Sequence, residues 1–168
     1  MNLKEAITIE FEFRVFEESY PRIYRCLSMI DDSMVWKQPN ECTPSIGNLV
    51  LHLCGNARQW VLSGLGDKVD NRDRDQEFVS QQNIKKSELI FLLENLKSNL
   101  KNTINSLSEE DIQQIYVIQG FSVSGFSILA HVMEHFSYHT GQITTLTKIA
   151  TGKQTGYYSE VDLNKRNG

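Results

Sequence analysis

The chain of 168 residues has the size of one ordinary domain, and its 40% hydrophobic and 23% charged residues exclude a disordered or low-complexity protein. Seventeen basic against 21 acidic side chains leave a formal net charge of −4, which disfavours nucleic-acid binding. No apolar run approaches the roughly 20 residues that span a bilayer, and the first residues lack the apolar core of a secretory signal. Three cysteines without CxxC spacing indicate reduced thiols. We therefore expect a single cytoplasmic domain over residues 1–168, with neither nucleic acid nor membrane as a partner.

The first segment carries two competing patterns. From Ile7 to Val15, apolar residues alternate strictly with polar ones, which is typical of a strand. From Val15 to Ile30 the apolar spacing becomes helical. An isolated strand would have no sheet to join in a chain whose other long segments are helical, so we expect helix for most of this segment.

Three further segments carry apolar residues at helical spacing. Thr43 is a good N-cap and Pro44 suits the first helical position, so the first of these helices is expected to begin there. Gly152 lies where a left-handed C-cap belongs, which ends the last of them. The three predicted helices cover residues 43–63, 89–107 and 124–152.

Two connectors separate these helices. The polar stretch from Leu65 to Asn83 runs for about 20 residues without periodicity, and a connection of that length is either functional or disordered. The connector from Ile115 to Val123 contains an apolar triplet and could be extended. With the first segment helical, the chain is predicted to be all-α, a four-helix bundle with the long polar connector between its second and third helices.

Three of the four histidines fall on the last predicted helix, at intervals of four residues. Neighbours at this spacing lie on one face, one turn apart, so such a pair can direct its ring nitrogens at one metal ion. At about 100° per residue, His139 lies about 50°, His135 about 90° and His131 about 130° from the centre of the apolar stripe. His131 is therefore predicted to turn toward solvent. His52, at the rim of an earlier helix, is the remaining histidine for a third ligand; the alternative is that all are boundary histidines satisfied by hydrogen bonds.

The motifs on these two helices resemble those of a known family. The last helix carries HVMEHFSYHTGQI, which is similar to the last-helix signature of DinB-like metal-binding helical bundles. The earlier one carries SIGNLVLHLCGNARQWV, which is similar to their second helix with its single histidine, and NRDRDQEF is similar to the connector of one subgroup. The resemblance extends from about Thr43 to Ile149. It implies an up-down-down-up four-helix bundle, a divalent transition metal such as zinc or nickel, and the ligands His52, His135 and His139.

The resemblance also suggests what the site does. Three histidines with an open coordination position form the donor set of a catalytic metal site rather than of a closed structural one. Some members of the family use the metal to activate a low-molecular-weight thiol, so the leading hypothesis is a metal-dependent, thiol-using S-transferase acting on a small molecule. The alternatives are a metal-dependent hydrolase that uses a metal-bound water, and a non-catalytic metal-stabilised binding or stress protein.

A different parsing of the last helix gives a rival enzyme. The segment from His131 to His135 matches the inverted zinc-peptidase pattern HxxEH, with Glu134 as the base. That class takes a third, acidic ligand far downstream. Here the acids after the motif are Glu160 and Asp162, near the end of the chain, so this reading is disfavoured.

Four further side chains are candidates for supporting roles. Glu134 and Gln142 could orient the ligand imidazoles, which metal-bound histidines generally require. Arg72 and Arg74, in the polar connector, could hold an anionic substrate near the metal. The alternative for each is an exposed helix position or a solvated loop.

A second copy of the chain is the expected macromolecular partner. The resemblance implies a homodimer, and Leu51, Leu62 and Ile128 are apolar positions outside the main helical stripes. These three positions are expected to contribute to an interface.

Overall fold

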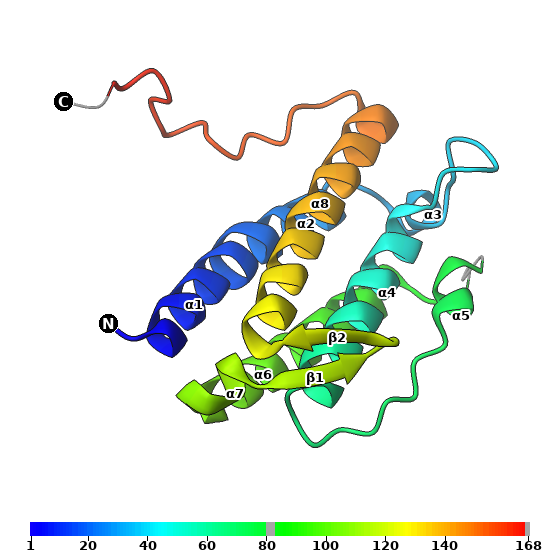
Figure 1. Cartoon of the computed structure of the whole chain (residues 1–168). Coiled ribbons are helices and arrows are strands. Elements are labelled where there is room, and N and C mark those ends of the chain that lie inside the picture. The colour runs from blue at the N-terminus through cyan, green and yellow to red at the C-terminus, as the bar shows by residue number, and fades with distance from the viewer. Residues whose placement is uncertain (80–82, 167–168) are drawn as a thin grey trace.

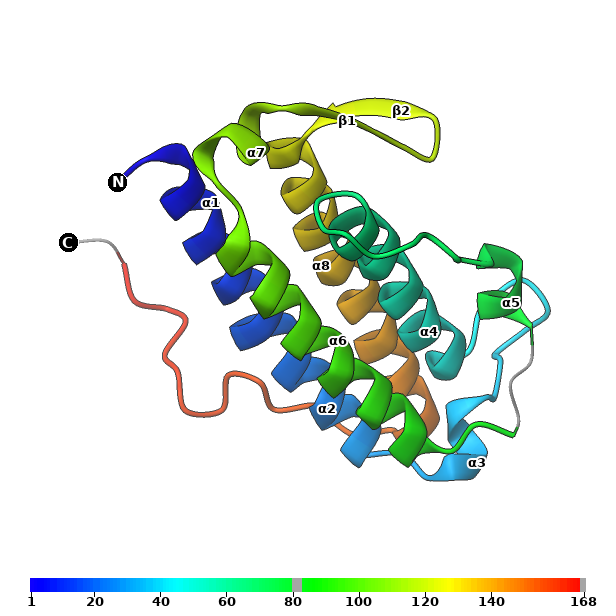
Figure 2. The ribbon, with the colours of Figure 1, turned by 90° about the horizontal axis from the view of Figure 1, so that it is seen from below.

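The computed structural model describes residues 1–79 and 83–166, and it is mostly helical, as predicted. Four long helical segments lie alongside one another around a shared core (Figures 1 and 2). In chain order these segments are α1 (Leu3–Phe11), the π-helical stretch η1 (Glu12–Ser19) and α2 (Tyr20–Ser28); α4 (Ile46–Ala57) and the π-helical stretch η2 (Arg58–Ser63); α6 (Lys86–Ser106); and α8 (Gly125–Thr151).

The all-α prediction needs a correction, because the connector before the last helix forms a β-hairpin. Ile115 pairs with Ser124 at its base, and the extended conformation expected there is confirmed. Gln119 and Gly120 form the two-residue turn with positive φ angles of 51° and 81°, which match the twist of antiparallel strands. The shorter elements are α3 (Asp32–Val35), α5 (Arg74–Phe78), α7 (Glu109–Gln113), β1 (Ile115–Ile118) and β2 (Phe121–Ser124).

The first segment is helical from Leu3 onward, as predicted against its local alternation. Ile7, Phe11 and Val15 are spaced four apart and buried, whereas the intervening Ile9 and Phe13 are exposed. Both periods are present in the sequence. The helical one prevails because the other three long segments offer an apolar face for one stripe of this helix and no neighbouring strand.

The predicted start of α4 is wrong by two residues. Ser45, rather than Thr43, is the N-cap. Its hydroxyl accepts from the N–H of Asn48, whose side chain in turn accepts from the N–H of Ser45, a reciprocal pair that satisfies two otherwise unpaired donors. The expected end of α8 is confirmed, since Gly152 adopts a left-handed φ of 65° as its C-cap.

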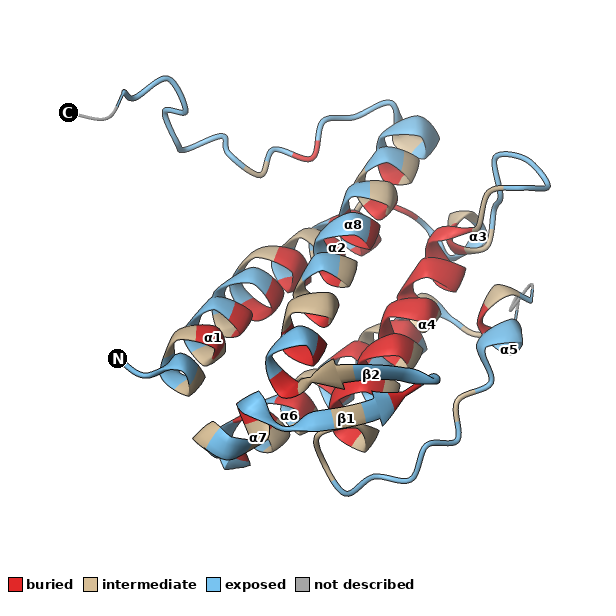
Figure 3. Cartoon of the chain, in the orientation of Figure 1, coloured by how far each residue is buried: buried red, intermediate tan, exposed pale blue. Residues whose placement is uncertain are grey.

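The long polar connector covers the outer side of α4. It contains α5, which packs against α4 (Figure 1). Residues 80–82, which the predicted connector includes, lie outside the described residues. Because of this cover, ten of the twelve residues of α4 are buried, and α4 is red over most of its length in Figure 3. His52 is therefore buried, with 6% of its surface exposed, rather than at a rim.

The core lies between the four long segments and is rich in aromatic and leucine side chains. Tyr20 stacks on Phe136 of α8 with ring centroids 5.6 Å apart. Its hydroxyl donates to the carbonyl of Leu93 in α6 at 3.1 Å, which satisfies the buried polar atom. Leu62 and Ile128, expected at a dimer interface, are buried within this core.

Candidate metal site

Three histidines converge between α4 and α8. His52 comes from the middle of α4, and His135 and His139 lie one turn apart on α8. Each offers one ring nitrogen, and these atoms all lie within 4.8 Å of one another, the one group of potential metal ligands found in residues 1–79 and 83–166. The Nε2 atoms of His52 and His135 are 3.0 Å apart. Ligand nitrogens around tetrahedral zinc are separated by about 3.3 Å, a spacing that this pair nearly matches.

His52 is held from behind by a carboxylate. Its Nδ1 lies 2.7 Å from Oε2 of Glu77, a buried residue of α5. An ionised carboxylate only accepts hydrogen bonds, so Nδ1 carries the hydrogen and donates it. The lone pair of His52 is then on Nε2, the nitrogen that faces His135. This is the tautomer that a metal ligand needs.

His139 is held in the same way by a neutral side chain. Its Nδ1 lies 2.7 Å from Oε1 of Gln142, one turn further along α8, and donates to it. The amide of Gln142 in turn donates to the hydroxyl of Tyr138 at 3.4 Å. Gln142 thus contacts a histidine as the sequence suggested, and it leaves Nε2 of His139 with its lone pair.

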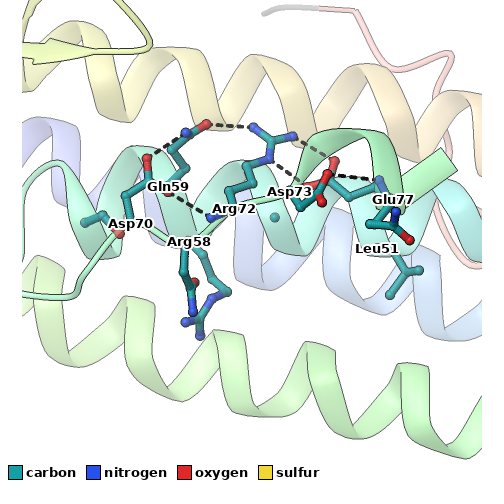
Figure 4. A pocket seen from close by; sticks show the side chains of 11 residues that line it. Leu51, Arg58, Gln59, Asp70, Arg72, Asp73 and Glu77 are labelled. Carbon is teal, nitrogen blue, oxygen red and sulfur yellow. Dashed lines mark hydrogen bonds and ion pairs between the residues drawn. The ribbon is translucent and has the colours of Figure 1, made fainter.

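The two arginines of the connector lie differently from the sequence expectation. Arg72 donates from Nε and Nη2 to the two oxygens of Glu77 at 2.7 and 2.8 Å, and from Nη1 to Gln59 at 2.9 Å (Figure 4). Its side chain is 5% exposed, so it is engaged within the protein rather than presented to an anion. Arg74 lies over the ring of Phe78, and Phe78 in turn contacts the ring of His52.

His131 lies outside the cluster, but it does not face solvent freely as predicted. Its Nε2 is 3.2 Å from the amide nitrogen of Asn56 on α4, and its ring stacks on Trp60 with centroids 3.9 Å apart. The angular count along α8 could not predict this, because Asn56 and Trp60 belong to another helical segment.

Glu134 lies on another side of α8. It is exposed and lines a groove with Arg14, Glu18 and Arg22 of the first helical segment. In the part of the chain that the structure describes, no hydrogen bond or ion pair joins it to a histidine. The orienting role suggested for Glu134, and the peptidase-like parsing that makes it a base beside the metal, both lack support in this geometry.

The electrostatics favour neutral imidazoles. Burial, and then the neighbouring histidines His139 and His52, lower the pKa of His135 to about 3. Burial also lowers the pKa of His139. Burial alone would raise the pKa of Glu77, but hydrogen bonds from Arg72 and His52 outweigh it and lower that pKa. At neutral pH His135 and His139 are therefore unprotonated, which is the ligand form of histidine that metals bind, and Glu77 is ionised.

Sequence reasoning missed Glu77. The connector from Leu65 to Val79 contains five acidic residues, and their local patterns are alike. A carboxylate behind a metal-binding histidine is common, so an acid from this connector was a reasonable expectation. Only the packing of α5 on α4 shows which of the five it is.

Next to the histidines the surface is hollowed. A mainly apolar cavity of about 580 Å³ lies between the segment that leads into α4, together with Leu49, and the second half of α8. Leu49, Tyr138, Gln142 and Leu146 are among its lining residues, so it adjoins the side chains that hold His139. Its volume is in the range of small-molecule sites.

In the part of the chain that the structure describes, no helix combines the length and the apolar composition that a membrane span requires. No curated protein matches the sequence.

Comparison with solved structures shows the fold. A DinB-like protein from Bacillus cereus ATCC 10987 is similar with a TM-score of 0.64 and 15% identity, over 80% of this chain and 87% of that one. A conserved protein from Enterococcus faecalis has a TM-score of 0.70 and 12% identity, over 91% and 99%. The family model described as a protein of unknown function, DUF1572, matches residues 9–159. The chain therefore belongs to the DUF1572 family, and the resemblance to DinB-like proteins is confirmed.

Proposed function

We propose that the protein is a metal-dependent enzyme with a divalent transition metal, zinc or nickel, on His52, His135 and His139. The observation that carries this proposal is the meeting of three imidazoles, two of which have their outer nitrogens fixed by hydrogen bonds. Glu77 and Gln142 each accept the Nδ1 hydrogen of a histidine, which leaves the inner Nε2 lone pairs available. The alternative, in which these are boundary histidines satisfied by hydrogen bonds, does not account for three ring nitrogens directed at one point.

The surroundings of the cluster support catalysis rather than a closed structural site. Three protein ligands leave a coordination position open. A metal there would polarise a carbonyl or lower the pKa of a bound thiol or water. His135 is half-buried, so this side of the cluster is accessible to a small molecule. The adjoining apolar cavity would receive the non-reacting part of that molecule and exclude water from it.

Among possible reactions we propose transfer to or from a low-molecular-weight thiol, on the strength of the DinB-like resemblance. The test is turnover of an electrophilic substrate, such as an aryl halide, by zinc- or nickel-loaded protein with a panel of small thiols. His52→Ala is the inactive control. Thiol-dependent turnover lost in the control supports the transferase. Hydrolysis of an ester or amide without any thiol would instead indicate a metal-dependent hydrolase. Metal binding without either reaction would indicate a non-catalytic binding protein.

The arrangement around the site is part of the proposal. We infer an up-down-down-up four-helix bundle, supported by the directions of the long segments in Figure 2, where the first and last run one way and the middle two the other.

The three cysteines are free, which supports a reducing compartment such as the cytoplasm.

We also propose a homodimer. Leu62 and Ile128 are internal, so this proposal rests on the resemblance to DinB-like proteins. Light scattering at micromolar concentration should give twice the 19.3 kDa chain mass; a monomer would contradict this proposal.

A further inference from the structure

The hydrogen bonds of His52 on the connector side allow only one tautomer. Two groups approach its Nδ1, the Glu77 carboxylate at 2.7 Å and Nη2 of Arg72 at 3.2 Å. If Nδ1 carried a lone pair to accept from Arg72, that lone pair would face an anionic oxygen at the shorter distance. Arg72 already donates from Nη2 to the same carboxylate at 2.8 Å. Nδ1 therefore carries the hydrogen, and Glu77 accepts it.

The carboxylate has this position because α4 offers a gap in its side-chain surface. Gly55 lies three residues after His52, on the same side of the helix. A Cβ atom at Gly55 would overlap Oε1 of Glu77, would come within 2.7 Å of its Cδ, and would lie 3.1 Å from Nε of Arg72. Any residue larger than glycine would displace the acid from His52.

Arg72 completes the arrangement around the carboxylate of Glu77. Its guanidinium binds both carboxylate oxygens with two nitrogens, and its third nitrogen reaches Gln59 on η2 (Figure 4). Gln59 is in turn bound to Asp70 of the connector at 2.8 Å. A planar fork of this kind fixes the orientation of a carboxylate, which a lysine ammonium does not.

We propose that Glu77 is a positioning residue of the metal centre, and that Gly55 and Arg72 form the seat that holds it against His52. The seat fixes the Nδ1–H tautomer of His52 and aims its Nε2 at His135. The connector is thus a working part of the site, although none of its residues is a ligand. This inference rests on the proposed function, since the Nδ1–H tautomer of His52 matters for a metal that binds at Nε2.

The first test needs no metal. Long-range proton–nitrogen NMR of metal-free protein with ¹⁵N-labelled histidine distinguishes the two tautomers, and His52→Asn assigns the resonances. The wild type should show His52 as the Nδ1–H tautomer at neutral pH. Gly55→Ala should lose that preference, and Glu77→Gln should weaken it, because a neutral amide oxygen accepts a hydrogen bond less strongly than a carboxylate. An Nε2–H tautomer in the wild type would overturn the proposal whether or not the protein binds metal.

The second test is zinc affinity, measured by competition with a chromogenic chelator. Gly55→Ala, Arg72→Lys and Glu77→Gln should each weaken binding about 10- to 100-fold while keeping the wild-type stoichiometry. Gly141→Ala on α8 is the matched control, because a Cβ there meets nothing within 4 Å. Circular dichroism checks that each variant folds. If Gly55→Ala fails to fold, Glu77→Gln, which keeps the shape of the side chain, still tests the role of the carboxylate.

A double variant shows whether Gly55 acts through Glu77. Gly55→Ala combined with Glu77→Gln should bind zinc no more weakly than Glu77→Gln alone, because both changes remove one interaction. Additive losses would contradict the seat. Wild-type affinity in all variants would overturn the inference and leave the proposed function standing, whereas a wild type that binds no zinc would overturn the proposed function.

Discussion

The three histidines are held by groups of different strength. His52 donates to a carboxylate that is itself paired with Arg72, whereas His139 donates to a neutral amide. His135 packs against both rings, with centroids 4.8 and 4.4 Å away. Hydrogen bonds to a charged acceptor are stronger than those to a neutral one, so His52 is the most firmly oriented of the three.

Two alanine variants on α8 test which histidines are ligands. His139→Ala should remove most metal affinity, well beyond the roughly 10- to 100-fold effect of an outer-sphere change. His131→Ala should keep most of it, because His131 is bound to Asn56 and stacked on Trp60. Calorimetric titration of both variants with zinc is the measurement. Equal losses would mean that the assignment of ligands on α8 is wrong.

Acidification should destabilise the metal-free protein. The folded pKa of His135 is about 3, below its ordinary value near 6.5, so between these values the unfolded chain binds a proton that the folded chain does not. The free energy of unfolding should therefore fall from pH 7 to pH 5, above the range in which Glu77 titrates. Urea titrations at both values measure this, with a smaller fall expected for His135→Asn. Unchanged or higher stability of the wild type at pH 5 would contradict the burial of neutral imidazole.

How far the sequence predicts the site depends on the residue. The i, i+4 spacing placed His135 and His139 together because it is a local property of one helix. The burial of His52 and the contact of Glu77 depend on a connector that crosses α4, and no local pattern encodes where it crosses. The same holds for His131, whose partner Trp60 comes from another helix.

At the level of elements, one side chain joins α4 to the connector. Asn48 accepts from the N–H of Ser45 and donates from Nδ2 to the carbonyls of Glu77 and Val79 at 2.9 and 3.0 Å. It is buried, with 1% of its surface exposed. The beginning of α4 and the end of α5 are therefore fixed to each other by the same amide.

Asn48→Ala should loosen this junction. It removes a capping partner and leaves two carbonyls unpaired, which together should lower the free energy of unfolding by about 1–3 kcal/mol. The connector should also become more sensitive to limited proteolysis under native conditions. Ser124→Ala, which removes the N-cap of α8, is the control for loss of a cap alone. Equal protease sensitivity in both variants would contradict a specific role for Asn48.

The elements also show where sequence patterns mislead. Ile9 and Phe13 complete an alternation in the first segment, yet they are exposed on a helix whose buried stripe has a period of four. Local periodicity alone does not decide between a strand and a helix here. The presence of three other helical segments, with no strand to pair with, favours the helix. The start of α4 was misplaced because Thr43, like Ser45, is a good cap, and the reciprocal bond with Asn48 distinguishes them.

Considered as a whole molecule, the metal would link segments distant in the chain. His52 belongs to the second long helical segment and His135 and His139 to the last, so a bound ion cross-links them. A ligand that binds only the folded state stabilises it by mass action. Free zinc at 100 times its dissociation constant should add about 2.7 kcal/mol, or about 5–10 °C in Tm. Thermal melts with and without zinc measure this shift, and the shift should be absent in His52→Ala.

The central claim is that one divalent transition metal is held by His52, His135 and His139. Its most direct test is elemental analysis of protein purified without a histidine tag, reconstituted with zinc or nickel at neutral pH and freed of excess metal. Folded wild-type protein should retain one metal ion per chain at pH 7, where His135 and His139 are neutral. Folded protein that retains no metal at neutral pH, or retains it equally when His52 and His139 are both alanine, would contradict the claim.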